Sequence, residues 1–218
     1  MGAGKSTASR AFGERITAAG LQVATYTEAA DPHPVRASDD LADFFQPWLE
    51  VEPSVLACRV RAKWARYVDR RLNDRVFTVM DGQLFHGDQT HLFMMEMRAT
   101  DLRAHVAELM GVLDPLGPVV IYFRHTDVRR AIHAVFEARG GKWESYQLDW
   151  KLRSPYAKHR KLEGLLGLTT MYEEYRGLTD SLFASLNCRK LTIEADAGDW
   201  HGYYTKITQL LEEANVRV

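Results

Sequence analysis

The 218-residue sequence has little of what marks secreted, membrane-spanning or polyanion-binding proteins. Two cysteines, Cys58 and Cys188, form no metal-binding pattern and imply no disulfide framework. The longest apolar runs are too short to cross a bilayer, and no apolar segment follows the first residues as in a secretory signal. The formal net charge is -1, so no excess of positive charge favours nucleic acid. We expect a cytoplasmic protein without a membrane or nucleic-acid partner.

Enough apolar sequence is present for a sizeable core, since 46% of the residues are hydrophobic and 26% are charged. Proline-containing stretches are short connectors, so we expect a single domain over residues 1–218. Short β-branched and aromatic runs predict buried strands at 21–26, 76–80, 119–123 and 190–193. Patterns with helical spacing lie at 6–19, 54–73, 90–110, 126–139, 168–186 and 201–214. This alternation indicates an α/β class with a parallel sheet covered by helices on both faces.

The most specific motif opens the chain and reads Met1-Gly2-Ala3-Gly4-Lys5-Ser6-Thr7. Its Gly-Lys-Ser run matches the end of a phosphate loop, in which glycines let backbone N–H groups converge on phosphate oxygens at a helix N-terminus. The lysine supplies a positive charge to the outer phosphates, and the serine hydroxyl ligates magnesium. We therefore expect a nucleotide to be held by Gly2, Ala3, Gly4, Lys5, Ser6 and Thr7.

On this motif and the order of elements behind it, the chain resembles the phosphate-loop kinases of nucleosides, nucleotides and small molecules. The resemblance implies a three-layer P-loop NTPase fold, a five-stranded parallel sheet in the order 2-3-1-4-5, and ATP with Mg²⁺ as cofactors. In that order the first strand is central and precedes the phosphate loop. The strand and the first glycine of the motif would fall before Met1, so we expect the natural chain to begin about 8–12 residues earlier.

Two acidic residues follow expected strands, where ligands bind in parallel sheets. Asp81 ends the run at 76–80 and is expected to hold magnesium with Ser6, close to it in space, or to take the acceptor proton. Glu28 follows the run at 21–26, where the family often carries a catalytic carboxylate. The family's Glu-Pro element is replaced here by Ala29 and Ala30, so the resemblance transfers no substrate, and a solvated loop carboxylate is an equal interpretation of Glu28.

The remaining site expectations rest on the same resemblance. The helix after the run at 119–123 is expected to bring Arg130 to the phosphates, and a basic, aromatic lid over 140–167 is expected to bring Arg160 over them as a mobile cover. The region 31–71 has the place of an acceptor-binding region and contains the aromatic residues Phe44 and Phe45. The loop at 193–200 takes the place that often cradles adenine.

The sequence thus predicts an ATP-dependent phosphotransferase that moves the γ-phosphoryl to a small acceptor, foremost a nucleoside or nucleotide. An antibiotic or small-alcohol O-phosphotransferase is the nearest alternative. A sulfotransferase-like enzyme is another, because the segment 122–128 resembles one that contacts a nucleotide 3′-phosphate. A nucleotide-binding protein without turnover is the third. The oligomeric state stays open, with a homodimer as one option.

Overall fold

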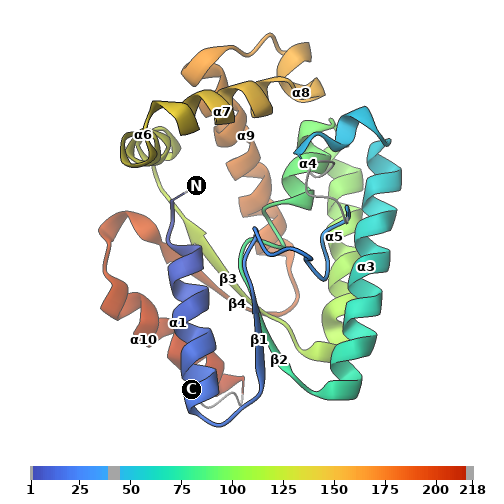
Figure 1. Cartoon of the computed structure of the whole chain (residues 1–218), viewed down its shortest axis with the longest axis vertical. Helices are drawn as coiled ribbons and strands as arrows, with labels where there is room; N and C mark the ends of the chain where they lie inside the picture. Colours follow the sequence, from blue (N-terminus) through green and yellow to red (C-terminus); the bar gives the residue numbers. More distant parts are fainter. Residues whose placement is uncertain (1, 39–44, 215–218) are drawn as a thin grey trace.

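The computed structural model describes residues 2–38 and 45–214 and shows a helix-rich α/β chain (Figure 1). Its strands are β1 (Val23–Tyr26), β2 (Phe77–Met80), β3 (Val119–Arg124) and β4 (Arg189–Glu194). Each coincides with a predicted strand to within two residues at either end. The runs therefore carried the strand signal through their β-branched and aromatic residues.

The strands form two parallel pairs rather than one sheet. β1 pairs with β2, with Val23 opposite Phe77, and β3 pairs with β4, with Val119 opposite Arg189. Among the described residues no strand joins β2 to β3, and these two do not pair directly. In the expected order the strand before Met1 is strand 1, so β1 and β2 correspond to expected strands 2 and 3, and β3 and β4 to expected strands 4 and 5. Both expected neighbour pairs are present, but the described residues do not form a single five-stranded sheet.

The strands are less covered than those of a continuous sheet. Of the strand residues, only Phe123 and Ile193 are buried, and the others are partly or fully exposed. Central strands of a doubly wound sheet normally lose both faces and both edges to neighbours. The partial exposure here follows from two pairs that each keep unpaired edges.

Helices make up the rest of the framework. Their bounds are α1 (Lys5–Ala18), α3 (Pro53–Asp74), α4 (Asp88–Met94), α5 (Ala99–Leu113), α6 (Val128–Arg139), α7 (Gly141–Leu152), α8 (Pro155–His159), α9 (Gly164–Ser185) and α10 (Trp200–Glu213). Short 3₁₀ turns lie at η1 (Pro47–Leu49), η2 (Asp114–Leu116) and η3 (Ala195–Ala197). The expected lid is thus built from α7, α8 and the start of α9.

One predicted helix was wrong in its length. The pattern at 90–110 is divided between α4 and α5, because Glu96 takes a left-handed φ of 62°. The Met97 N–H bonds the Leu92 carbonyl at 3.0 Å, which completes a Schellman-type end to α4. Apolar spacing continues through this break, so periodicity alone does not reveal it.

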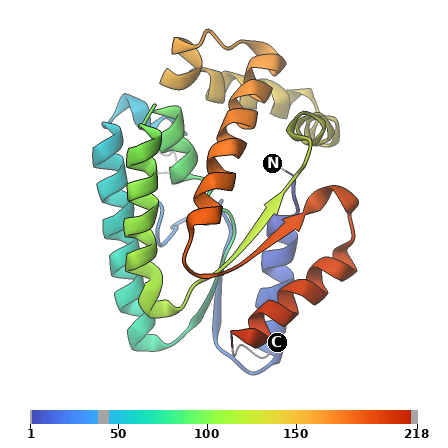
Figure 2. The ribbon, with the colours of Figure 1, turned by 180° about the vertical axis from the view of Figure 1, so that it is seen from behind.

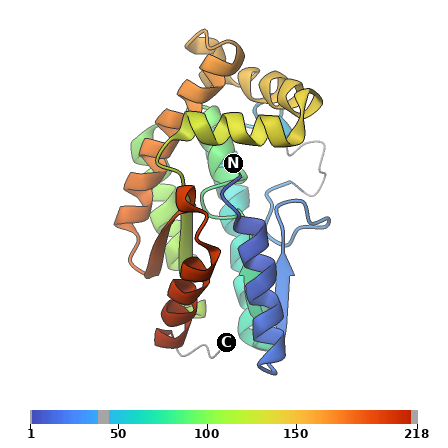
Figure 3. The ribbon, with the colours of Figure 1, turned by 90° about the vertical axis from the view of Figure 1, so that its left-hand side faces the viewer.

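The core is divided by the strand pairs. One cluster joins α1 and α10 to β3 and β4, and a larger one packs α3, α5 and α9 beside β1 and β2. α1 and α10 lie side by side (Figure 3), with the rings of Phe12 and Tyr204 5.6 Å apart. Seen from behind, α3 and α5 lie on the side away from α1 and α10, and α9 runs between the two groups (Figure 2).

A third cluster lies at the end of the molecule where α1 begins. It joins Met94 of α4 to Ile132 and Phe136 of α6 and to Leu168 and Met171 of α9. α6, α7 and α8 lie across this end (Figure 1). Across the described residues, no helix combines the length and apolar character needed to cross a membrane.

Candidate active site

The loop before α1 has the backbone shape of an anion-binding nest. Gly2 and Gly4 have φ values of 68° and 80°, and Ala3 between them is not among the residues of positive φ. Alternation of this kind turns successive backbone N–H groups toward one point. Gly4 caps α1 without a side-chain hydrogen bond, and the first turn holds no acidic residue. The positive end of α1 therefore faces this loop, and no acidic residue of the helix's own first turn opposes it.

Both glycines are also required by close neighbours. A Cβ on Gly4 would lie 1.8 Å from Cη2 of Trp200, and one on Gly2 would lie 2.3 Å from Cγ2 of Val135. The start of α10 and the middle of α6 thus pack directly against the loop. Any side chain at either position would both clash and strain the backbone.

Ser6 and Asp81, 75 residues apart, meet at this loop. The Ser6 hydroxyl donates a hydrogen bond to Oδ2 of Asp81. Asp81 is only 2% exposed, and its Oδ1 has no hydrogen-bond partner in the described part of the chain. The predicted proximity of these two residues is confirmed, and it brings the end of β2 to the first turn of α1.

A hydroxyl and a carboxylate are hard oxygen ligands of the kind magnesium prefers. Residues 2–38 and 45–214 contain no group of three or more His, Cys, Asp or Glu side chains arranged to hold a metal ion. Mg²⁺ in proteins usually binds through one or two carboxylates, with water and substrate phosphates completing the shell, and the oxygens of Ser6 and Asp81 are of the kind that such a site uses. The unpartnered Oδ1 of Asp81 fits such a ligand.

Glu28 lies in the same place as Asp81. Its Oε2 is 2.8 Å from Nε2 of His86, and a Cβ on Gly82 would lie 3.2 Å from that same oxygen. The hydrogen bond from His86 lowers the pKa of Glu28 to about 2 against the opposing effect of burial, with further lowering by the charges of His86 and Lys5. Glu28 is therefore an ionised carboxylate within the electrostatic influence of Lys5, which the motif alone did not establish.

A buried lysine that the sequence analysis did not select faces this carboxylate. Lys151 of α7 is 2% exposed, and its Nζ lies 3.4 Å from the ring centroid of Trp150. Burial lowers the pKa of Lys151 to about 7, although the charge of Glu28 raises it in part. Gln147 and Lys151, four residues apart, are the buried residues of α7, and nothing in the sequence distinguishes Lys151 from the other lysines of this segment.

His91 and Tyr172 complete what we call the inner polar cluster, made of Glu28, His86, His91, Lys151 and Tyr172. His91 of α4 is 1% exposed, and burial, together with the charges of Lys151 and His86, holds its pKa well below the ordinary value. The Tyr172 hydroxyl of α9 is buried without a hydrogen-bond partner among the described residues, and burial and the Glu28 charge raise its pKa. Five parts of the chain, the loops after β1 and β2 and the helices α4, α7 and α9, therefore contribute to this cluster.

The two predicted arginines are not brought to the phosphate loop. Arg160 pairs with Glu96 at 2.6 Å, and its guanidinium lies 3.8 Å from the ring centroid of Tyr156. Arg130 is exposed on α6, five residues before Val135, which touches Gly2. Five residues turn a helix by about 140°, so Arg130 projects away from the face that meets the loop. Both arginines lie in the segments where the sequence predicted them. Arg160 is held by Glu96, and the phase of α6 points Arg130 away from the loop before α1.

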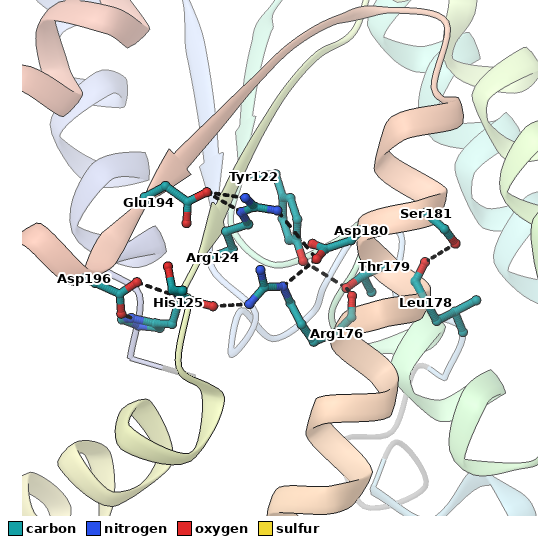
Figure 4. Close-up of polar contacts among 11 residues, drawn as sticks. Tyr122, Arg124, His125, Arg176, Leu178, Thr179, Asp180, Ser181, Glu194 and Asp196 are labelled. Atoms are coloured by element: carbon teal, nitrogen blue, oxygen red, sulfur yellow. Dashed lines mark hydrogen bonds and ion pairs between the residues drawn. The ribbon is translucent and has the colours of Figure 1, made fainter.

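The ends of β3 and β4 form an ionic network with α9 (Figure 4). Arg124 pairs with Glu194 and lies 3.5 Å from Asp180, while Arg176 pairs with Asp180 at 2.7 Å. His125 pairs with Asp196 at 3.0 Å. The network ties β3 to β4 and α9, and its arginines are already matched by carboxylates.

The region 31–71, expected to bind the acceptor, meets the segment expected to form the lid through aromatic residues. The indole N–H of Trp150 donates to the Phe45 carbonyl, and the two rings are 4.9 Å apart. Tyr146 packs beside both rings, with centroids 6.2 Å from Phe45 and 5.9 Å from Trp150. Phe44 and the rest of 39–44 lie outside the described residues. The described part of the region 31–71 therefore reaches α7 at the inner polar cluster.

No model of a known protein family matches this chain, and no curated protein matches it.

Proposed function

We propose that the chain is an ATP-dependent phosphotransferase of the P-loop NTPase fold. The observation that carries the proposal is the hydrogen bond between Ser6 and Asp81 at the N-terminus of α1. It joins a glycine nest, a lysine, a hydroxyl and a strand-end carboxylate in one place, which is the set of groups that phosphoryl transfer requires. The parallel pairs and the helices on both sides of them agree with this fold.

Each group has a role in the proposed reaction. The backbone N–H groups of Gly2–Gly4 and the Lys5 ammonium bind the phosphates of ATP, and Ser6 and Asp81 hold the magnesium that neutralises their charge. Trp200 is 36% exposed beside Gly4 and offers an aromatic face to adenine.

Glu28 is placed to orient an acceptor hydroxyl. With a pKa of about 2 it stays ionised, and His86 holds its carboxylate in position. So weak a base takes the acceptor proton only as the new O–P bond forms and the hydroxyl becomes acidic. The aromatic residues Phe45, Tyr146 and Trp150 pack together, with Trp150 against Lys151, which the Glu28 charge influences; flat rings of this kind suit a nucleoside or nucleotide, the acceptor class we favour.

The described contacts give less support to a sulfotransferase-like reaction. In the segment 122–128, which carries that resemblance, the arginine is Arg124, and it is matched by Glu194 and Asp180. Calorimetry with ATP against the sulfate-donor nucleotide separates the two donors. Binding of ATP with no turnover on any acceptor would instead indicate a nucleotide-binding protein.

The direct test measures ADP release from MgATP across nucleosides, nucleotides and small alcohols. Lys5→Ala should weaken ATP binding, and Asp81→Asn should lower turnover by about 10²–10³-fold, because each removes charge stabilisation from the transition state. Lys206→Ala, at an exposed position of α10, is the matched control. Unchanged turnover in a folded Lys5→Ala protein would refute the proposal.

A further inference from the structure

A cavity of about 240 Å³ lies between α1 and α10, where these two helices run side by side (Figure 3). It opens to solvent and is lined by one residue of α1 and five of α10, namely Arg15, His201, Tyr204, Thr205, Thr208 and Gln209. Arg15 follows Lys5 by ten residues in the same helix, which separates the two by about 15 Å along its axis. The cavity is therefore distinct from the candidate active site.

The exposed guanidinium of Arg15 is held in place by uncharged groups. Its Cζ lies 5.2 Å from the centroid of the Phe12 ring and 5.3 Å from that of the Tyr204 ring. Its Nη1 donates a hydrogen bond to the Thr208 hydroxyl at 3.2 Å. A guanidinium carries five N–H donors in a rigid fork, so most of them remain for a ligand. Because the side chain is already fixed, binding orders it at little further entropic cost.

The described part of the chain brings no counter-ion to Arg15. Glu14 and Glu212 are acidic residues of the same two helices, and neither forms an ion pair with it. Residues 215–218, which follow α10 outside the described residues, contain no Asp or Glu side chain. The cavity therefore presents a fixed positive charge that aromatic rings and a hydroxyl support.

Two further hydrogen-bond donors line the cavity beside Arg15. The Thr208 hydroxyl accepts from Arg15, which leaves its own hydrogen to donate. The Gln209 amide is exposed and carries two N–H donors. The Thr205 hydroxyl instead donates to the His201 carbonyl at 3.0 Å. N–H and O–H donors grouped around a guanidinium suit an anion with several oxygens.

We propose that this cavity binds a phosphate group, with the Arg15 guanidinium and the Thr208 hydroxyl as its main contacts. Its volume is below the roughly 300–1,000 Å³ of sites for drug-sized ligands, so the occupant is a phosphate ion or a small phosphate ester. A bound phosphate bridges the two helices whose first residues meet where Trp200 packs against Gly4. The site is additional to the phosphate loop and does not depend on the proposed function.

Amide NMR of the ¹⁵N-labelled whole chain locates the bound anion during titration with sodium sulfate, with sodium chloride exchanged to keep the ionic strength constant. Amides of 201–209 and those around Arg15 should shift and saturate with a Kd of about 1–10 mM, the strength of about two charge-assisted hydrogen bonds. Shifts at Gly2–Ser6 report the phosphate loop separately, because the two sites share no residue.

Arg15→Met should weaken sulfate binding at 201–209 about 10–100-fold and leave any binding at the phosphate loop unchanged. Thr208→Val keeps the guanidinium and its two rings and should weaken binding about 3–10-fold. Arg10→Met, at an exposed position of the same helix, is the matched control and should behave as wild type. The spectrum of each variant also shows whether it is folded.

Shifts at 201–209 that grow linearly with sulfate, or that saturate alike in wild type and in Arg15→Met, would overturn the inference. If Arg15→Met does not fold, an unchanged Kd in Thr208→Val overturns it instead. Titration with inorganic phosphate and with glycerol phosphate separates the two sources of the phosphate group. Tighter binding of the ester identifies a phosphorylated metabolite, whereas equal or weaker binding identifies the free ion.

Discussion

Replacing Lys151 with methionine should stabilise the ligand-free protein, and the gain should depend on pH. Methionine keeps most of the side-chain volume and removes the buried amine. Burial lowers the pKa of Lys151 from 10.5 to about 7. Each unit by which the pKa is lowered corresponds to about 1.4 kcal/mol. Keeping Lys151 protonated in the folded state therefore costs at most about 5 kcal/mol. Water penetration and relaxation reduce this, so about 2–5 kcal/mol is expected.

The direction of the pH dependence follows from proton counts. Between pH 7 and pH 10.5 the unfolded chain holds more protons at this lysine than the folded protein does. The contribution of Lys151 to the free energy of unfolding therefore rises with pH across this window and is constant below it. The advantage of Lys151→Met should be largest at pH 6–7 and should shrink toward zero near pH 10.

Urea unfolding at unit steps from pH 6 to pH 10 measures this difference. Each variant is compared with wild type at the same pH, so titration of other groups cancels to first order. Lys142→Met should show no trend, since its side chain is exposed in both states. A difference between Lys151→Met and wild type that stays constant from pH 6 to pH 10 would refute the burial of a titrating amine.

Three further predictions concern the neighbourhood of the site. Gly4→Ala should lower the free energy of unfolding by about 1–3 kcal/mol, because the Gly4 φ is 80° and the new methyl group would meet the Trp200 ring. Adding Trp200→Ala should relieve the clash but not the backbone strain, so thermal unfolding of the single and double variants separates the two effects. Tyr172→Phe should leave the free energy of unfolding of the ligand-free protein within about 1 kcal/mol of wild type, because the hydroxyl has no hydrogen-bond partner among the described residues. A loss above about 2 kcal/mol in urea unfolding would contradict this. Arg124→Ala should destabilise the protein by about 0.5–1 kcal/mol, less at high salt, and should leave the ATP affinity measured by calorimetry unchanged, because its partners are carboxylates of the fold.

Local sequence was sufficient for features that depend on few neighbours. Strand positions followed from short apolar runs, and the glycine loop followed from a motif whose backbone requirements are written in the residues themselves. The contact between Ser6 and Asp81 could also be predicted, because parallel strands deliver their carboxyl ends to one edge. That inference used topology and needed no side-chain geometry.

Features that depend on helix phase and on partners distant in sequence were decided by tertiary structure. Arg130 and Arg160 lie in segments of the expected kind, yet one projects away from the loop and the other meets Glu96. Lysine is a residue type that usually lies on the surface, yet Lys151 is buried. The reason is that α7 packs against α9, and Gln147 and Lys151 are on the buried face of α7. A charge pattern reports which side chains exist, whereas their direction and pKa depend on the packing of several elements at once.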